Sequence, residues 1–220
     1  MVIYIFLLIY FQTSSPMRKQ FSQKGFTLLE LVVAIGIFLL LGVGFASILV
    51  VSLRTNDIVW NQLESQNDAR HVLQEVVDDV RRAESSSIGS YAIVTSTAYE
   101  FAFYANVDSD SLREEVRFWL DGDILKKGVT KPAGNPLVYN AANEEVRELA
   151  HSVVNITEGV NLFEYFDETY EGVGSGLVDP IDMTAIRSVR VSLEIEKDPD
   201  KSPEPFHAET FVQIRNLKTN

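Results

Sequence analysis

The chain has 220 residues, of which 46% are hydrophobic, and this length allows one modest domain together with a membrane segment. It contains no cysteine, which excludes disulfides and thiolate metal sites. The net charge is −12, but the first 25 residues hold three bases and no acid, so the remaining 16 bases and 31 acids give a net charge of −15. This balance argues against a phosphate-binding surface, and we expect no direct nucleic-acid binding.

The first 16 residues, MVIYIFLLIYFQTSSP, form a short apolar extension ahead of a second methionine. Its apolar part, Val2 to Phe11, has ten residues and is too short to span a membrane as a helix. Met17 followed by Arg18 and Lys19 is a typical start for a basic leader. We therefore expect translation to begin at Met17 and residues 1–16 to be a gene-boundary error. The alternative is a genuine extended leader.

A long apolar run follows the leader. Leu31 to Leu53 contains 23 residues without a charge, which as a helix would be about 35 Å long and would cross a ~30 Å hydrocarbon core. The bases Arg18, Lys19 and Lys24 flank its N-terminal end, so the positive-inside rule predicts a cytoplasmic N-terminus. A secretory signal would place its apolar region before the cleavage site, whereas here the basic segment and a glycine come first. The sequence predicts a single-pass protein whose domain lies across the membrane.

Glu30 stands just inside the start of this apolar run. An acid deep in a membrane helix costs roughly 2.5–3.5 kcal/mol, and less near an interface, so it usually signals a partner or a function. A carboxylate at the headgroup level is the simpler interpretation. If the chain is cut after Gly25, however, Phe26 acquires a free amine four residues before Glu30. Ammonium and carboxylate could then neutralise one another between packed helices and set their axial register.

The segment KGFTLLELVVAIGIF resembles the N-terminal signature of type IV pilins and type II secretion pseudopilins. In that family a basic leader ends in glycine, phenylalanine follows, and glutamate is the fifth residue after the cut; Gly25, Phe26 and Glu30 match these positions. The resemblance covers Arg18 to Leu53. It implies that a prepilin peptidase cuts the Gly25–Phe26 bond and N-methylates Phe26, and that the mature subunit is assembled into a filament. The run lacks the proline that many pilins carry.

An amphipathic helical pattern continues from the apolar run to about Glu84, where serines and Gly89 end it. Its apolar positions recur near helical spacing and form one stripe that needs a cover. The residues of that stripe are Val59, Leu63, Val72, Leu73, Val76, Val77 and Val80.

Several segments with strand patterns are expected to form a sheet that covers this apolar stripe. EVRFWL and ILKK flank an Asp-Gly turn at Asp121–Asp123 and predict a hairpin. Ser188–Glu196 alternates cleanly, and Ala208–Asn216 is expected to pair with it. The other expected strands are Ala98–Ala105 and Val160–Phe166. The predicted fold class is α+β, a long N-terminal helix packed on an antiparallel β-sheet domain.

The expected organisation has four parts: a leader (1–25), a membrane-spanning and filament-core half-helix (26–53), an amphipathic half-helix (54–84) and an extracytoplasmic β-rich domain (85–220). The order FWLDGDILKK, VNLFEYFD, IRSVRVSLEIE and FVQIRN resembles J-type minor pseudopilins and the related W-type minor pilins. That resemblance implies a subunit near a filament tip that helps to initiate assembly.

Several other patterns carry less weight. Four acids, Asp108, Asp110, Asp121 and Asp123, could meet around calcium, although acidic loops are common without a metal. We expect no cofactor and no catalytic set, and the glycines at 172–176 suit a flexible loop rather than a phosphate cradle. Asn155-Ile156-Thr157 matches a glycosylation sequon, a pattern frequent by chance.

Three functional classes remain open. The first is a structural subunit of a type II secretion pseudopilus that supports protein export, with a type IV pilus minor pilin acting in pilus assembly, adhesion, motility or DNA uptake as its alternative. The second is an exposed binding module, and the third a signal-anchored enzyme, which would need a convergent polar site. The expected partners of a subunit are prepilin peptidase, other pilins or pseudopilins through the N-terminal helix, the inner-membrane assembly platform and membrane lipid. Its expected location is the bacterial inner membrane.

Overall fold

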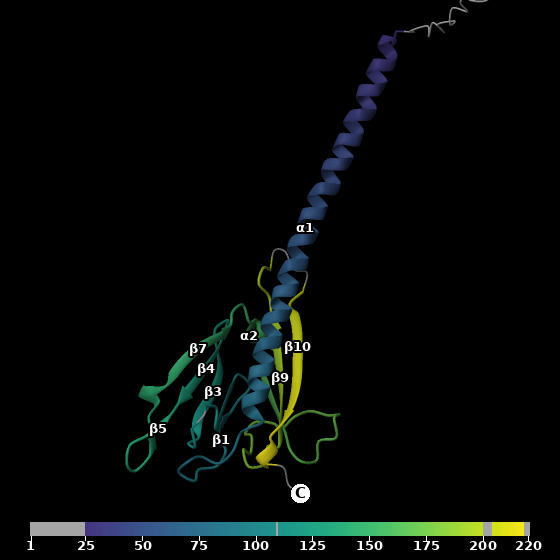
Figure 1. Cartoon of the computed structure of the whole chain (residues 1–220). Coiled ribbons are helices and arrows are strands. Elements are labelled where there is room, and N and C mark those ends of the chain that lie inside the picture. Colours follow the sequence, from purple (N-terminus) through teal and green to yellow (C-terminus); the bar gives the residue numbers. More distant parts are fainter. Residues whose placement is uncertain (1–24, 109, 200–203, 218–220) are drawn as a thin grey trace, which may run out of the picture. The chain divides into compact units, whose positions relative to one another are not determined.

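The computed structural model describes residues 25–108, 110–199 and 204–217. The chain divides into two compact units, residues 1–50 and 51–220. Helix α1 (Leu28–Val80) supplies most of what is described in the first unit and continues into the second. The strands and the remaining helices all belong to the second unit (Figure 1).

Helix α1 ends at Val80, four residues before the end expected from the sequence. The reason is that the chain joins the sheet at once. Ala83 forms an isolated antiparallel bridge with Ala105, and the Glu84 N–H donates to the Tyr104 carbonyl at 2.8 Å. The Glu84 N–H, which a further helical turn would have directed to a carbonyl of the helix, is thus satisfied by the sheet.

The strands form two larger antiparallel sheets rather than one. The first has the order β1-β2-β3-β4-β7, and the expected hairpin at the Asp-Gly turn is its β3–β4 pair, with Asp121 opposite Ile124. Gly122 has φ +66 in that turn, a conformation that glycine adopts without strain. The strand bounds are β1 (Ile93–Ser96), β2 (Glu100–Ala105), β3 (Glu114–Asp121), β4 (Ile124–Thr130) and β7 (Glu145–Ala150).

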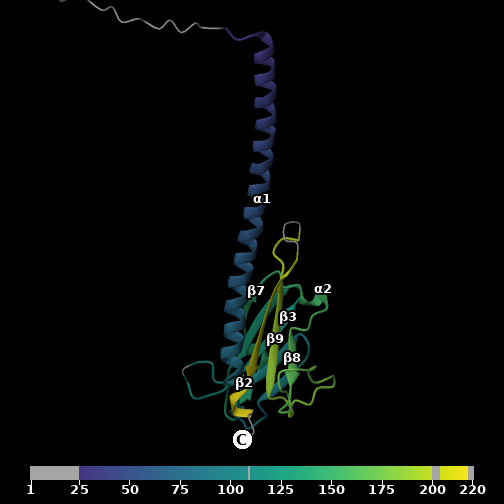
Figure 2. The same cartoon turned by 90° about the vertical axis from the view of Figure 1, so that its right-hand side faces the viewer.

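The second sheet has the order β10-β9-β8, and Figure 2 shows β8 and β9 side by side. The expected pairing of the last two strands is confirmed, because Phe206 to Gln213 pair with Ile195 to Ser188 without a shift in register. The bounds are β8 (Phe163–Phe166), β9 (Ser188–Ile195) and β10 (Phe206–Gln213). The remaining elements are short: β5 (Pro132–Ala133), β6 (Val138–Tyr139), η1 (Ala141–Asn143), α2 (Asn155–Glu158) and η2 (Arg215–Leu217).

One hydrophobic core joins the second part of α1 to both larger sheets, which lie on either side of it in Figure 1. The α+β fold class, with a helix packed on antiparallel strands, is thereby confirmed. From Val72 onward the predicted stripe is buried, except for Val77, which is partly buried, whereas Val59 and Leu63 are 47% and 45% exposed. The sheet does not extend that far along the helix, since Lys197, just past the end of β9, already pairs with Glu64 and Asp68. The buried face of α1 consists of Ser65, Ala69, Val72, Leu73, Val76, Asp79 and Val80.

A group of ion pairs, centred on the buried Lys127, connects α1 to the five-stranded sheet. Lys127 of β4 is 8% exposed, and its Nζ lies 2.5 Å from Asp79 Oδ2 and 2.8 Å from Glu75 Oε1. Arg147 of β7 also binds Glu75. Burial raises the pKa of Asp79, while the neighbouring Lys127 acts in the opposite direction.

Candidate prepilin-type N-terminus and other candidate sites

The predicted processing point lies on an open stretch of chain. A side chain added at Gly25 would meet nothing within 4 Å apart from its neighbours along the chain, and Phe26 is 86% exposed. The leader bases Arg18, Lys19 and Lys24 fall outside the described residues. The backbone around the Gly25–Phe26 bond is therefore free of tertiary contacts within the described part of the chain.

Glu30 has a hydrogen-bonding partner that sequence reasoning missed. Its Oε2 accepts from the backbone N–H of Thr27 and from the Thr27 hydroxyl, each at 2.9 Å. In return, the Glu30 N–H donates to Thr27 Oγ1 at 3.2 Å, and the Leu31 N–H donates to the Thr27 carbonyl. This reciprocal arrangement is a capping box, in which threonine and the glutamate three residues later satisfy the free donors of a helix start. The T-x-x-E spacing at 27–30 was the signal that could have revealed it.

The capping box changes the account of Glu30. The acid does not depend on a new N-terminal amine for a partner, because the uncut chain already supplies two donors. Both bonds end on the same oxygen, Oε2, so the carboxylate keeps capacity for a further donor.

Residues 31–53 of α1 are apolar on almost every side, and among the described residues nothing buries them. Its most apolar stretch of 18 residues has a mean hydropathy of 2.7, and by length and composition it could cross a membrane. The hydroxyl of Ser47 is satisfied within the helix, since it donates to the Val43 carbonyl at 2.9 Å. A helix that is hydrophobic all round requires an apolar environment, either lipid or other helices.

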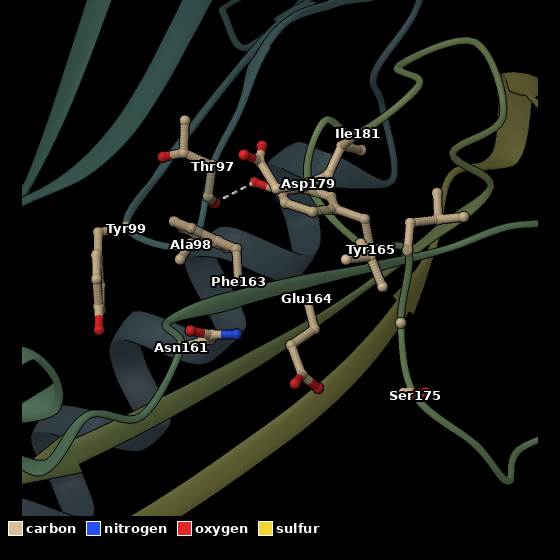
Figure 3. Close-up of a pocket in the computed structure, with 13 residues that line it drawn as sticks. Thr97, Ala98, Tyr99, Asn161, Phe163, Glu164, Tyr165, Ser175, Asp179 and Ile181 are labelled. Carbon is tan, nitrogen blue, oxygen red and sulfur yellow. Dashed lines mark hydrogen bonds between the residues drawn. The ribbon is translucent and has the colours of Figure 1, made fainter.

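The second unit contains a pocket of about 660 Å³ beside β8, shown in Figure 3. Tyr165 crosses from β8 to the β1–β2 loop, and its hydroxyl donates to the Thr97 carbonyl at 2.9 Å. In the same view Glu164 points away from Thr97, and its carboxylate pairs with Arg190 of β9 at 2.9 Å. Tyr165 and Glu164, two of the polar residues that line this pocket, are therefore engaged in structural contacts.

The glycine-rich loop contributes to the wall of this pocket. Gly176 packs against β8, because a side chain there would lie 2.8 Å from the Tyr165 carbonyl oxygen, and the next N–H, that of Leu177, donates to that oxygen. The sequon asparagine is structural as well: Asn155 is fully buried and bonds to the Ser192 carbonyl and the Glu194 N–H of β9.

The four acids that the sequence offers as weak calcium candidates do not come together. Asp108 and Asp110 lie in the loop before β3, whereas Asp121 and Asp123 flank the turn after it. The eight residues of β3 separate the two pairs by about 25 Å at 3.3 Å per residue, which no single ion can bridge. Asp121 instead pairs with Lys126, while Asp108 and Asp110 lie near Glu114, a residue that the sequence analysis did not select.

Comparison with known proteins identifies the N-terminal segment. Residues 20–46 match the model described as the prokaryotic N-terminal methylation motif. No curated protein matches the chain. Among solved structures, the GspK–GspI–GspJ complex from the type 2 secretion system of enterotoxigenic Escherichia coli contains a similar chain, with 11% identity and a TM-score of 0.39, over 68% of this chain and 97% of that one. A likeness at that level carries no argument about function.

The matched motif, together with the apolar helix that it opens, is that of a membrane-anchored protein with a prepilin-type N-terminus. The motif resembles the N-terminal segment of type IV pilins and type II secretion pseudopilins, and the match is confined to residues 20–46.

Proposed function

We propose that the chain is a minor pilin-like subunit that is processed by prepilin peptidase and built into, or at the tip of, a type II secretion pseudopilus that supports protein export. The observation that carries the proposal is the N-terminal methylation motif at residues 20–46, joined to an apolar helix that no other described residue covers. Lipid would cover the helix before assembly, and the helices of neighbouring subunits would cover it afterwards.

In this proposal the peptidase cuts between Gly25 and Phe26 and methylates the new amine of Phe26. The lack of contacts around Gly25 supports access to that bond. Glu30 would then act in assembly through its charge, taking the amine of a neighbouring subunit as an additional partner. Arg18, Lys19 and Lys24 would hold the leader in the cytoplasm, with the second unit on the periplasmic or extracellular side of the inner membrane.

A type IV pilus minor pilin is the second candidate, because the same N-terminal helix serves both machines. The order of segments between FWLDGDILKK and FVQIRN favours the secretion pseudopilus only by its resemblance to J-type subunits. Deletion in the native host separates the two. Loss of protein export with intact twitching and DNA uptake supports the pseudopilus, whereas the reverse pattern supports the pilus.

The first experiment measures the intact mass and N-terminal sequence of the membrane-extracted chain, with and without co-expressed prepilin peptidase. The expected result is a chain that begins at N-methylated Phe26 only when the peptidase is present. A chain that begins at Met1 or Met17 under both conditions would reject the proposal and leave a plain signal-anchored protein.

A further inference from the structure

The loop between β2 and β3 gathers three acids around one point. One carboxylate oxygen from each of Asp108, Asp110 and Glu114 lies within 4.8 Å of the other two. Two oxygens that share a calcium ion at about 2.4 Å are separated by at most about 4.8 Å, so the spacing suits a single ion. Asp108 and Asp110 are exposed, which leaves a route for an ion from solvent.

Glu114 is what distinguishes this group from an ordinary acidic loop. Its side chain is fully buried at the start of β3, and its Oε2 accepts from the Val107 N–H at 3.1 Å. Its Oε1 is also buried, and it has no hydrogen-bond partner among the described residues. A buried carboxylate oxygen without a donor is costly, so such an atom beside two further carboxylates indicates a missing positive partner.

Lys131 meets this need only in part. Its Nζ binds Asp108 Oδ2, and no hydrogen bond within the described residues joins it to Glu114 Oε1. The Lys131 side chain is 56% exposed, so it can turn into solvent without disturbing the core. Three carboxylates and one ammonium leave a net charge of −2. If the lysine moves away, the three carboxylates carry −3, and a divalent ion would reduce this to −1.

We propose that Asp108, Asp110 and Glu114 bind a divalent cation, of which calcium fits best because it accepts an irregular set of carboxylate and water oxygens. The backbone already holds two of these side chains in place, since Asp108 Oδ1 accepts from the Asp110 N–H and Asp110 Oδ1 accepts from the Leu112 N–H. The ion would connect the end of β2 to the start of β3 and hold the loop between them. This inference is independent of the proposed function.

The test is calorimetric titration of the full-length chain in detergent, first stripped with a chelator, with calcium and then magnesium chloride. The expected result is one calcium per chain with a Kd on the order of 10⁻⁴ M or tighter, magnesium binding at least ten-fold weaker, and a midpoint of thermal unfolding that rises with calcium. Absence of calcium binding at millimolar concentration overturns the proposal.

Substitutions then locate the ion. Asp110→Asn and Glu114→Gln should each weaken calcium binding by about ten-fold or more, because each removes a charged ligand. Glu114→Gln keeps an oxygen for the Val107 N–H, and Asp110 is exposed, so both variants are expected to fold; near-ultraviolet circular dichroism checks this. Wild-type affinity in both folded variants overturns the proposal.

Lys131→Gln provides a test of the opposite sign. Removing an ammonium that competes for Asp108 should tighten calcium binding by about five-fold. The matched control is Lys126→Gln, which removes the same charge from an ion pair with Asp121 at the far end of β3, and its affinity should stay within about two-fold of wild type. An unchanged or weaker affinity in Lys131→Gln would place the ion elsewhere and overturn the proposal.

Discussion

At the scale of single residues, the structure distinguishes two properties of Glu30. A sequence motif alone does not distinguish them. One is its hydrogen bonding to Thr27, which caps the helix, and the other is its negative charge. Glutamine at the same position can still cap, because its side-chain oxygen accepts from an N–H, but it carries no charge. Threonine can be replaced without touching the charge.

We therefore predict different outcomes for Glu30→Gln and Thr27→Val. In a host with its own assembly machinery, Glu30→Gln should reduce cross-linking between neighbouring subunits at least ten-fold, whereas Thr27→Val should reduce it no more than about two-fold, if the charge drives assembly. Quantitative cross-linking of membrane fractions measures this, with peptidase processing of both variants as a control. Equal losses in the two variants would assign the role of Glu30 to the cap.

A second prediction concerns the proposed cut between Gly25 and Phe26. Gly25→Val should abolish processing, because the peptidase must fit a small residue with wide backbone freedom before the scissile bond. Phe26→Leu should be processed at no less than about half of the wild-type extent, since an exposed apolar side chain is retained there. Intact mass after co-expression with the peptidase distinguishes the two. Efficient processing of Gly25→Val would contradict the assigned cleavage position.

At the scale of elements, the contact between α1 and β4 depends on an unequal ion pair. The Lys127 ammonium donates hydrogen bonds to two carboxylates, those of Asp79 and Glu75. The Asp79 carboxylate, in contrast, accepts a side-chain hydrogen bond from Lys127. Removing the lysine leaves Asp79 buried without that cation, whereas removing the aspartate charge leaves Lys127 still bound to Glu75. The two substitutions should therefore differ in cost although they break the same bond.

We predict that Lys127→Met lowers the free energy of unfolding by about 3 kcal/mol at pH 7, and that Asp79→Asn changes it by less than about 1 kcal/mol. The folded state already raises the pKa of Asp79 through burial, and loss of Lys127 raises it further. As the pH falls toward that raised pKa, the folded state takes up the proton before the unfolded state does, so the deficit of Lys127→Met should shrink. Urea unfolding at pH 7 and pH 5 measures this, and a deficit that grows on acidification would contradict the assignment.

The strands show what the sequence can and cannot predict at this scale. The alternation from Val189 to Ile195 and the Asp-Gly turn both predicted their elements, because each depends on neighbours in the chain. Strand β7 was missed, since EVRELA is an edge strand exposed along most of its length and offers no apolar face to recognise. The sequence also did not predict the ion pairs of Lys127 or the unpaired oxygen of Glu114. Both depend on burial by residues that are distant in the sequence.

At the scale of the whole molecule, the second unit is expected to unfold as one body. Its two larger sheets share a single hydrophobic core, and the hydroxyl of Tyr165 links β8 to backbone carbonyls of Thr97 and Glu100 beside the other sheet. Burial raises the pKa of Tyr165 well above its usual value, so the hydroxyl is a hydrogen-bond donor at neutral pH.

We predict that Tyr165→Phe lowers the free energy of unfolding by about 1 kcal/mol and leaves unfolding cooperative, because it removes the hydrogen bonds from β8 to the Thr97 and Glu100 carbonyls but keeps the aromatic ring in the core. Urea unfolding of the detergent-solubilised chain, followed by tyrosine and tryptophan fluorescence and by circular dichroism, provides the measurement. Two separate transitions in the wild type would show that the sheets unfold independently and would contradict the shared core.

The hydrogen bonds between Thr27 and Glu30 also bear on the energy balance of the proposed filament. A subunit waiting in the bilayer does not carry a bare charge, because its own backbone and hydroxyl already solvate the acid. On joining a filament, Glu30 would then exchange one set of hydrogen-bonding partners for another, rather than gain partners for an unpaired carboxylate. Such an exchange releases less free energy than the pairing of an unpaired carboxylate would, so it is easier to reverse. A subunit held in this way could return from the filament to the membrane and be used again.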